Sequence, residues 1–184
     1  MTKLRDYSGK FDPDFGHNKL SRDALLKLLK GYSEYILRID GHWYLTVMQK
    51  WGNDAAFDCD VMVWEKLALY EMRMISSLLN IHGDDVVTVM KAMQVSPWMW
   101  TYDCATDIKS NDHAITTCHN CPTLLALEKE GKGREKLICQ ELEPKLMGIM
   151  AHFFNPDIKV TPLKLPPRKS SNEICCQWEF KLER

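Results

Sequence analysis

Apolar residues in the first part of the chain recur every three or four positions, which is the spacing of an amphipathic helix. The first such stripe follows Ser21, a good N-cap, and continues to Gly52, a residue that favours helix ends. Gly41 lies inside the stripe, at a position where the helix can bend or break. The stripe consists of Leu25, Leu28, Leu29, Tyr32, Ile36, Ile39, Trp43, Tyr44, Val47, Met48 and Trp51.

A second long stripe predicts another helix. Asn53 or Asp54 can cap it, and it ends near His82 and Gly83. Its inner face consists of Phe57, Val61, Trp64, Ala68, Met72, Ile75 and Leu79. A shorter helix follows, with Val86, Val89 (or Met90) and Met93 facing inward, and it stops at Ser96 and Pro97. The first half of the chain is therefore predicted to be helical.

The pattern changes to period two after Pro97, because large apolar residues now alternate with smaller ones at Trp98, Trp100 and Tyr102. Alternation with aromatic residues and threonine predicts a strand, a turn at KSND, and a second strand over residues 113–118. Pro122 and Gly131 then bracket a predicted helix, and residues 138–154 form another that stops at NPD.

The chain ends in a predicted hairpin, in which IKVTPLKL and EICCQWEFKL are joined by PPRKSSN. In a regular strand Cys176, Trp178, Phe180 and Leu182 share one face, and Cys175 points to the other. Helices followed by strands mixed with helices predict one α+β domain over residues 1–184, with the N-terminal helices packed on an antiparallel sheet. Residues 1–18, rich in Asp, Gly, Pro and Lys, are expected to form an extended arm.

Composition and charge narrow the class of protein. The 184 residues are 45% hydrophobic and 27% charged, as in an ordinary globular domain, and the net charge of −1 provides no strong field for nucleic acid. No apolar run approaches the roughly 20 residues that span a bilayer, and the N-terminus lacks the apolar core of a secretory signal. We therefore expect a cytoplasmic protein without nucleic-acid or membrane partners.

The seven cysteines are the most distinctive feature of the composition. An odd number without an export signal argues against a disulfide framework. Cys118 and Cys121 form a C-x2-C pair, which suits two ligands of one tetrahedral ion, and Cys139 with Cys176 or Cys175 can complete the set. We favour Cys176, because it shares the apolar face of its strand. Four thiolates suit Zn²⁺ or an iron–sulfur centre.

The same pair allows other interpretations. His119 lies beside it and can replace one metal ligand. A C-x-x-C pair at a helix N-terminus also supports thiol exchange, although no βαβ unit precedes it as in thioredoxins. A third possibility is a group of reduced structural thiols. Cys59 and Cys104 are predicted to be core residues, because free cysteine is usually buried.

Asp40 and His42 are the candidates for proton transfer. They flank Gly41 near the middle of an apolar helical stripe, where a buried acid or base is costly unless it is paired. The alternative is that both side chains face solvent. No P-loop, Rossmann fingerprint, H-E-x-x-H or G-x-S-x-G sequence is present, and GKGREK is interpreted as a solvated turn.

Two segments, RIDGHWYLTVMQKWGNDAAFDCDVMVWEK and CHNCP…G…C…CCQWEF, resemble the L-2-amino-thiazoline-4-carboxylic acid hydrolases and their relatives. The second half also resembles the vinyl-reductase-like domain, found in sensors where C-terminal cysteines hold zinc beside a small-molecule pocket. The resemblance implies an α+β homodimer that opens a small heterocycle or binds a small ligand. It matches Cys118, Cys121, Cys139 and Cys176 to the family's cysteines, and Asp40 and His42 to its DGxW-like segment.

The leading hypothesis is thus a small hydrolase for a heterocyclic or cyclic-amide substrate, with a cysteine-rich zinc site. Four cysteines would close that site and make it structural, and a three-cysteine site would leave room for an activated water. With a closed site, catalysis would fall to Asp40 or His42 as general base. The alternatives are a ligand-binding or sensory module with structural zinc, and an iron–sulfur or corrinoid-linked accessory protein.

Overall fold

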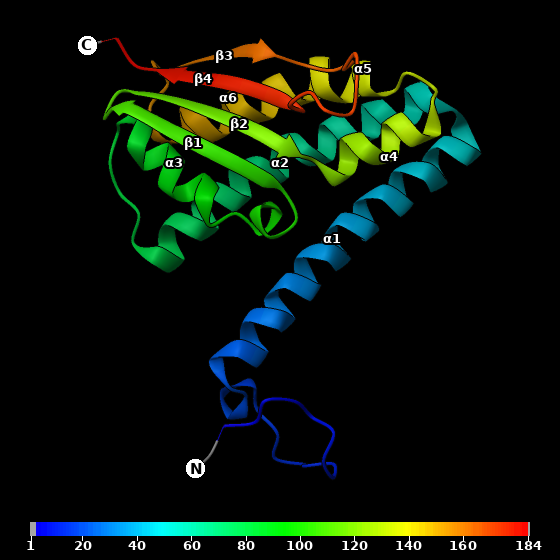
Figure 1. The fold of residues 1–184 in the computed structure, drawn as a ribbon, viewed down its shortest axis with the longest axis vertical. Helices are drawn as coiled ribbons and strands as arrows, with labels where there is room; N and C mark the ends of the chain where they lie inside the picture. The colour runs from blue at the N-terminus through cyan, green and yellow to red at the C-terminus, as the bar shows by residue number, and fades with distance from the viewer. Residues whose placement is uncertain (1–2, 184) are drawn as a thin grey trace.

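The computed structural model describes residues 3–183, in which two long helices form an antiparallel hairpin (Figure 1). Helix α1 (Arg22–Trp51) begins at Ser21, whose Oγ accepts a hydrogen bond from the backbone nitrogen of Ala24, so the predicted N-cap is confirmed. The helix runs through Gly41 without a break and ends at Gly52, which has φ +88°. Helix α2 (Asn53–Leu79) follows directly.

The end of α2 differs from the prediction. The helix stops at Leu79 rather than near Gly83, because Asn80 adopts the left-handed conformation with φ +54°. Asparagine tolerates this conformation better than most residues, so it can end a helix as glycine does. Helix α3 (Val86–Gln94) follows, capped by the Asp85 side chain.

The predicted strand at Trp98 and Trp100 is wrong. Both residues lie in a 3₁₀ helix, η2 (Pro97–Trp100), and the strand begins only at Asp103. Pro97 occupies the first helical position, and Ser96 Oγ accepts a hydrogen bond from Trp98 N at 3.4 Å. A proline after a capping serine favours a helical turn, and this local signal overrides the period-two pattern.

The sheet has four antiparallel strands in the order β1-β2-β4-β3. Their bounds are β1 (Asp103–Ser110), β2 (His113–Asn120), β3 (Lys159–Lys164) and β4 (Cys176–Lys181). Trp178, Phe180 and Leu182 are at most 7% exposed, which confirms the apolar face predicted for the last strand. The predicted turn before His113 is also confirmed.

A third helical region connects β2 to β3. Helix α4 (Pro122–Glu130) starts at Pro122 and ends at the left-handed Gly131, as predicted. The predicted helix over residues 138–154 instead begins as α5 (Glu135–Leu137), continues as a π-helical turn, η3 (Ile138–Leu142), and becomes α6 (Glu143–Phe154). Such π turns often occur at functional sites, because the extra residue reorients nearby side chains.

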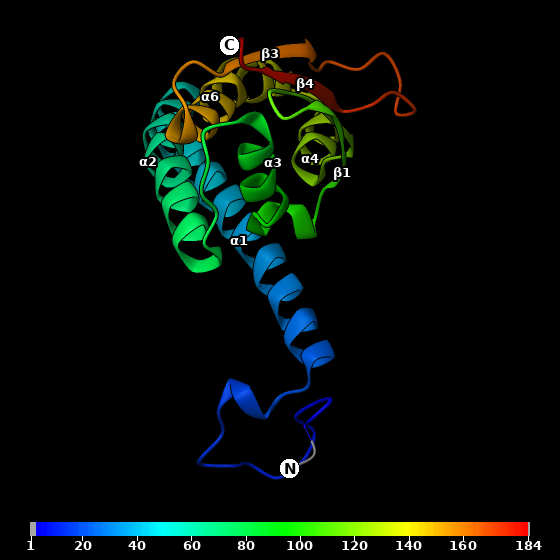
Figure 2. The ribbon, with the colours of Figure 1, turned by 90° about the vertical axis from the view of Figure 1, so that its left-hand side faces the viewer.

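The elements form an α+β fold, as the sequence predicts. Helices α3 and α6 pack on one face of the sheet, and one buried cluster lies between them and Trp178 and Phe180. A second cluster joins α1, α2 and α6 (Figure 2). The acidic side chains of Asp40, Asp60 and Glu143 come from the three helices of this second cluster.

The N-terminal half of α1 extends away from the body and leads to the arm (Figures 1 and 2). The arm is irregular, and it is tied to the helix start by Leu4, whose backbone bonds Lys19 O at 2.9 Å and Ser21 N at 2.7 Å. Residues 1 and 2 of the predicted 1–18 arm lie outside the described residues.

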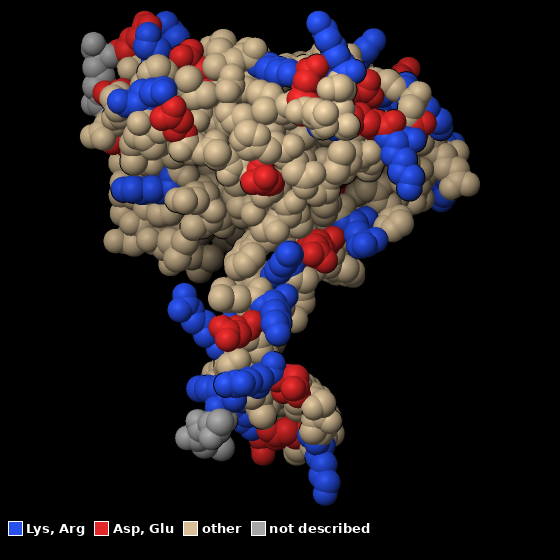
Figure 3. Space-filling model, viewed as in Figure 1, with Lys and Arg blue, Asp and Glu red and all other residues tan. Residues whose placement is uncertain are grey.

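Charged side chains lie along α1 and around the rim of the body, and the centre of the face shown in Figure 3 is largely uncharged. Across residues 3–183, none of the helices combines the length and the apolar character that crossing a bilayer requires.

Candidate functional site of buried carboxylates and thiols

Asp40 on α1 and Asp60 on α2 face one another across the helical hairpin. The indole nitrogen of Trp64 donates a hydrogen bond to Asp40 Oδ1 at 3.0 Å, and it also interacts with Asp60. One N–H group therefore serves two carboxylates, which must lie close together. Burial raises the pKa of Asp40, and burial together with the Asp40 charge raises that of Asp60 to about 7.

Glu143 adds a third carboxylate from the first residue of α6. The residue keeps part of its surface exposed, yet protein atoms surround its carboxylate, and this loss of solvation raises its pKa to about 7. The charges of Asp40 and Asp60 contribute to the same shift. Three like-charged groups from three helices thus lie together, and their protonation states depend on one another.

One cation lies near this group. Arg134 stacks on Tyr44, with Cζ 4.7 Å from the ring centre, and its charge partly offsets the rise in the pKa of Asp60. The guanidinium is engaged by Glu130, which accepts from Nε at 2.6 Å. No ion pair within residues 3–183 involves Asp40, Asp60 or Glu143. The carboxylates are therefore kept apart from neutralising partners, an arrangement typical of acid–base sites.

The structure separates the two residues that the sequence proposed for proton transfer. Asp40 points to Trp64 and the other acids. His42 is exposed on α1. The two side chains lie on different faces because α1 remains a regular helix through Gly41, so residues two apart do not meet.

The four cysteines predicted as metal ligands do come together. Cys118, Cys121, Cys139 and Cys176 belong to one packed cluster, with Leu124 and Tyr102. Glu143 acts electrostatically on Cys121, Cys139 and Cys176, so the thiols and the carboxylates border one another. The cluster combines four elements: Cys118 lies near the end of β2, Cys121 caps α4, Cys139 lies in η3 and Cys176 begins β4.

These thiols suit soft metal ions by their chemistry, but their placement does not form a ligand shell. Among residues 3–183, no three His, Cys, Asp or Glu side chains are arranged so that they could hold a metal ion. Burial raises the pKa of Cys121 to about 12 and raises that of Cys139 further, so neither is a ready thiolate without a metal.

Cys175 also joins this cluster, although strand alternation predicted that only one of the adjacent cysteines would do so. Cys175 is 1% exposed and lies just before β4, where the alternation does not yet hold. Its backbone nitrogen bonds Cys118 O at 2.8 Å. Its Sγ lies 3.7 Å from Arg168 Nη1.

The prediction for Cys104 is wrong. It was expected in the core, but it is exposed on β1, directly opposite Cys118. Cys118 is in turn opposite Cys176 on β4, so three thiols form a row across the sheet. The contact with Cys118 lowers the pKa of both Cys104 and Cys176. The same two contacts raise the pKa of Cys118. Cys59, by contrast, is half-buried against the core, as predicted.

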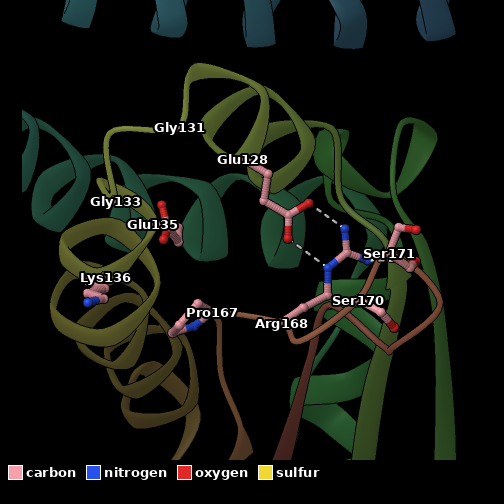
Figure 4. A pocket seen from close by; sticks show the side chains of 9 residues that line it. All are labelled: Glu128, Gly131, Gly133, Glu135, Lys136, Pro167, Arg168, Ser170 and Ser171. Carbon is pink, nitrogen blue, oxygen red and sulfur yellow. Dashed lines mark hydrogen bonds and ion pairs between the residues drawn. The ribbon is translucent and has the colours of Figure 1, made fainter.

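A hollow of about 490 Å³ lies beside the cluster, between the end of α4, the start of α5 and the loop before β4 (Figure 4). Arg168 lines the hollow and forms a bidentate ion pair with Glu128. Its Nε lies 2.8 Å from Oε1 of Glu128, and its Nη2 lies 2.5 Å from Oε2. The GKGREK turn, including Gly131 and Gly133, forms its other wall, and both glycines have positive φ. Glu128 therefore occupies the Arg168 guanidinium, and Lys136 is a second basic residue that lines the hollow.

Comparison with known proteins gives a family but no activity. Residues 18–182 match a family of unknown function, DUF6125. The chain belongs to the DUF6125 family. No curated protein and no solved structure matches the chain. The DUF6125 match links the chain to neither the thiazoline hydrolases nor the vinyl-reductase-like domain, so those resemblances stay predictions.

The residues matched to DUF6125 include every carboxylate and thiol of the site. Sequence reasoning missed Asp60, Glu143 and Cys104. Asp60 lies on the inward side of the α2 stripe, between Phe57 and Trp64, and this acid at an apolar position was an available signal. Cys104 gave no such signal, since its importance depends on strand register.

Proposed function

We propose that this DUF6125 member is a hydrolase for a small heterocyclic or cyclic-amide substrate, with Asp60 and Glu143 as its acid–base pair. The observation that supports this proposal is the grouping of three carboxylates from α1, α2 and α6, two of which have pKa values of about 7. Buried acids that titrate near neutral pH are suited to proton transfer.

The pair can supply both proton transfers of a ring-opening hydrolysis. Near pH 7 one carboxyl of such a pair is ionised and the other is protonated. The Glu143 carboxylate accepts a proton from water, and the water oxygen adds to the C=O or C=N carbon of the ring. The π electrons move onto the carbonyl oxygen or imine nitrogen and return when the leaving group departs. The C–N or C–S bond then breaks, and the leaving nitrogen or sulfur takes the electron pair and the proton of Asp60. The reaction consumes one water molecule. A proton then passes from Glu143 back to Asp60, so that each carboxyl regains its original protonation state.

Charge narrows the class of substrate. Three neighbouring acids create a negative potential that favours a protonated or N–H-rich ring, such as an amidine-like thiazoline. Asp40 is held by Trp64 and is suited to bind such a nitrogen rather than to move protons. The rings of Trp64 and Trp98 lie in edge contact beside the acid group, with their centres 5.0 Å apart, and they would offer apolar contacts to such a ring.

The test is an assay of ring opening with L-2-amino-thiazoline-4-carboxylic acid and a panel of cyclic amides. Glu143→Gln keeps size and removes the titration, so it should reduce kcat at least about 100-fold. Glu141→Gln is the matched control, because Glu141 is exposed two residues earlier, and it should keep full activity. Turnover that survives in Glu143→Gln contradicts the assignment. Binding without turnover would instead support a small-ligand-binding or sensory module.

A second proposal concerns a structural metal. We propose that Cys118, Cys121, Cys139 and Cys176 hold a zinc ion, with an iron–sulfur cluster as the alternative. Support comes from their shared cluster and their ligand chemistry, and the present side-chain placement would have to close around the ion. Metal analysis and a visible spectrum of the purified chain test this. Colourless protein with one zinc per chain supports it, and metal-free folded protein with seven titratable thiols contradicts it.

We also propose that the chain forms a homodimer through α1. Leu29, Tyr32, Ile36, Ile39 and Trp43 are each 39–50% exposed, although all are large and apolar. They are spaced alternately three and four positions apart, the spacing of a coiled-coil seam. A contiguous exposed stripe of this kind marks an interaction surface, and a second α1 has the complementary pattern.

A further inference from the structure

Three cysteines lie side by side on one face of the sheet. Cys118 is directly opposite Cys104 on one side and Cys176 on the other. Opposite residues in antiparallel strands have Cα atoms about 4.5–5.5 Å apart, which is within the range of a disulfide. The outer two are separated by two strand spacings, roughly 10 Å, which is too far for a bond. Cys118 can therefore bond either neighbour, but only one at a time.

The three thiols differ in their access to solvent. Cys104 is exposed on β1, an edge strand of the sheet. Cys118 is 7% exposed, and Cys176 is half-buried. A register shift between Asp103 and Cys104 marks a bulge next to the pair, a feature that turns side chains at functional edges. A molecule from solvent thus meets Cys104 before the other two.

We infer that this row carries out thiol–disulfide exchange with a low-molecular-weight disulfide, with Cys104 as the entry thiol. The Cys104 thiolate attacks one sulfur of the external disulfide, a mixed disulfide forms, and one external thiolate leaves. Cys118 then attacks Cys104 Sγ, which forms the Cys104–Cys118 bond and releases the second external thiolate, and this leaving thiolate takes the Cys118 proton. Two protein thiols are oxidised and one external disulfide is reduced to two thiols.

A third exchange moves the disulfide inward. The Cys176 thiolate attacks Cys118 Sγ, so the Cys118–Cys176 bond forms and Cys104 returns to the thiol state. This exchange moves the disulfide from the edge strand to β4, and it consumes no further oxidant. This activity is separate from the proposed hydrolysis, and it uses Cys118 and Cys176 in their metal-free state.

The experiment exposes the full chain to oxidised glutathione, quenches it with acid at intervals, and maps disulfides by peptide mass. The wild type should show Cys104–Cys118 first and Cys118–Cys176 later. Cys118→Ser should stop with glutathione on Cys104, and Cys104→Ser should slow disulfide formation at least about tenfold. Cys59→Ser, which changes a half-buried thiol on α2 outside the row, should behave as the wild type.

Oxidation of Cys104→Ser at the wild-type rate would overturn the inference, as would glutathione captured mainly by another cysteine in Cys118→Ser. Zinc that stays bound and prevents both disulfides would also overturn it in favour of the metal site. Loss of ring-opening activity in Glu143→Gln has no bearing on these outcomes, so the two proposals fail independently.

Discussion

The indole nitrogen of Trp64 donates to Oδ1 of Asp40 at 3.0 Å, and the same N–H also interacts with Asp60. This relationship joins α1 to α2 at the level of the acid group. A buried N–H between two carboxylates stabilises whichever of them is ionised, so Trp64 helps to decide where the negative charge resides.

Replacing Trp64 with phenylalanine removes this donor and keeps most of the apolar contact. The pKa values of Asp40 and Asp60 should rise further, and the free energy of unfolding should fall by about 1–3 kcal/mol at pH 8. The loss should be smaller at pH 5, where Asp60, with a pKa of about 7, is largely protonated. Urea unfolding measures both values, and Trp51→Phe at the exposed C-terminal end of α1 is the control. An equal loss at both pH values would contradict the role of the N–H.

Stability should fall as pH rises through the window set by the raised acids. The pKa values of Asp60 and Glu143 are about 7 in the folded chain, and the ordinary values are 3.8 and 4.5. Between about pH 4 and pH 7 the folded chain therefore holds protons that the unfolded chain has released, so the stability present below pH 4 is lost by pH 8. We expect a loss on the order of 1–3 kcal/mol after allowance for solvent screening.

The Glu143→Gln variant should flatten this pH profile and be more stable than the wild type at pH 8, because it removes a charge that is costly to bury. Thermal unfolding across pH 4–8 provides the measurement. Glu141→Gln, at an exposed position, should keep the wild-type slope. A Glu143→Gln profile as steep as the wild type would show that Glu143 is not one of the raised acids.

Arg168 is predicted to depend on Glu128. The Arg168 side chain is only 3% exposed, and Glu128 is its two-fold carboxylate partner. Glu128→Gln would leave a buried guanidinium without its counter-charge, so we expect a loss of about 2–4 kcal/mol in unfolding free energy. Glu130→Gln is the comparison variant, because Glu130 is a neighbouring acid that pairs with Arg134 and not with Arg168. Stability of Glu128→Gln equal to wild type would show that solvent replaces the pair.

The proposed dimer predicts a mass of two chains by size-exclusion chromatography with light scattering. Ile36→Glu introduces a charge into the centre of the exposed stripe and should give monomers that remain folded. Lys27→Glu also changes charge on α1, but it lies outside the stripe and should leave the dimer intact. A wild-type monomer, or a dimer unaffected by Ile36→Glu, would contradict the α1 interface.

Much of the architecture follows from local sequence signals. Ser21, Gly52, Pro122 and Gly131 set helix ends through capping and backbone preferences, and these effects act over a few residues. Alternation in the last strand placed Trp178 and Phe180 in the core for the same reason. The sequence predicted the wrong element where two local signals competed. At Ser96 and Pro97 the signal for a helical turn outweighed the strand-like alternation of the tryptophans.

The site was less predictable, because it depends on contacts between distant segments. Asp40 was identified as an acid on an apolar stripe, but its partners Asp60 and Glu143 come from other helices. Cys104 lies next to Cys118 only through the register of β1 and β2. Residue spacing in the sequence does not show which residues of two strands lie opposite one another. The row of thiols therefore follows from the structure and not from the sequence.

The most direct test of the acid–base pair is a pH titration of the chain by NMR with ¹³C-labelled Asp and Glu carboxyl groups. Carboxyl signals should titrate near pH 7, and they should be lost or shifted in Asp60→Asn and Glu143→Gln. Glu141→Gln should leave them unchanged. If every carboxyl in the wild type titrates below about pH 5, as exposed acids do, Asp60 and Glu143 are not an acid–base pair.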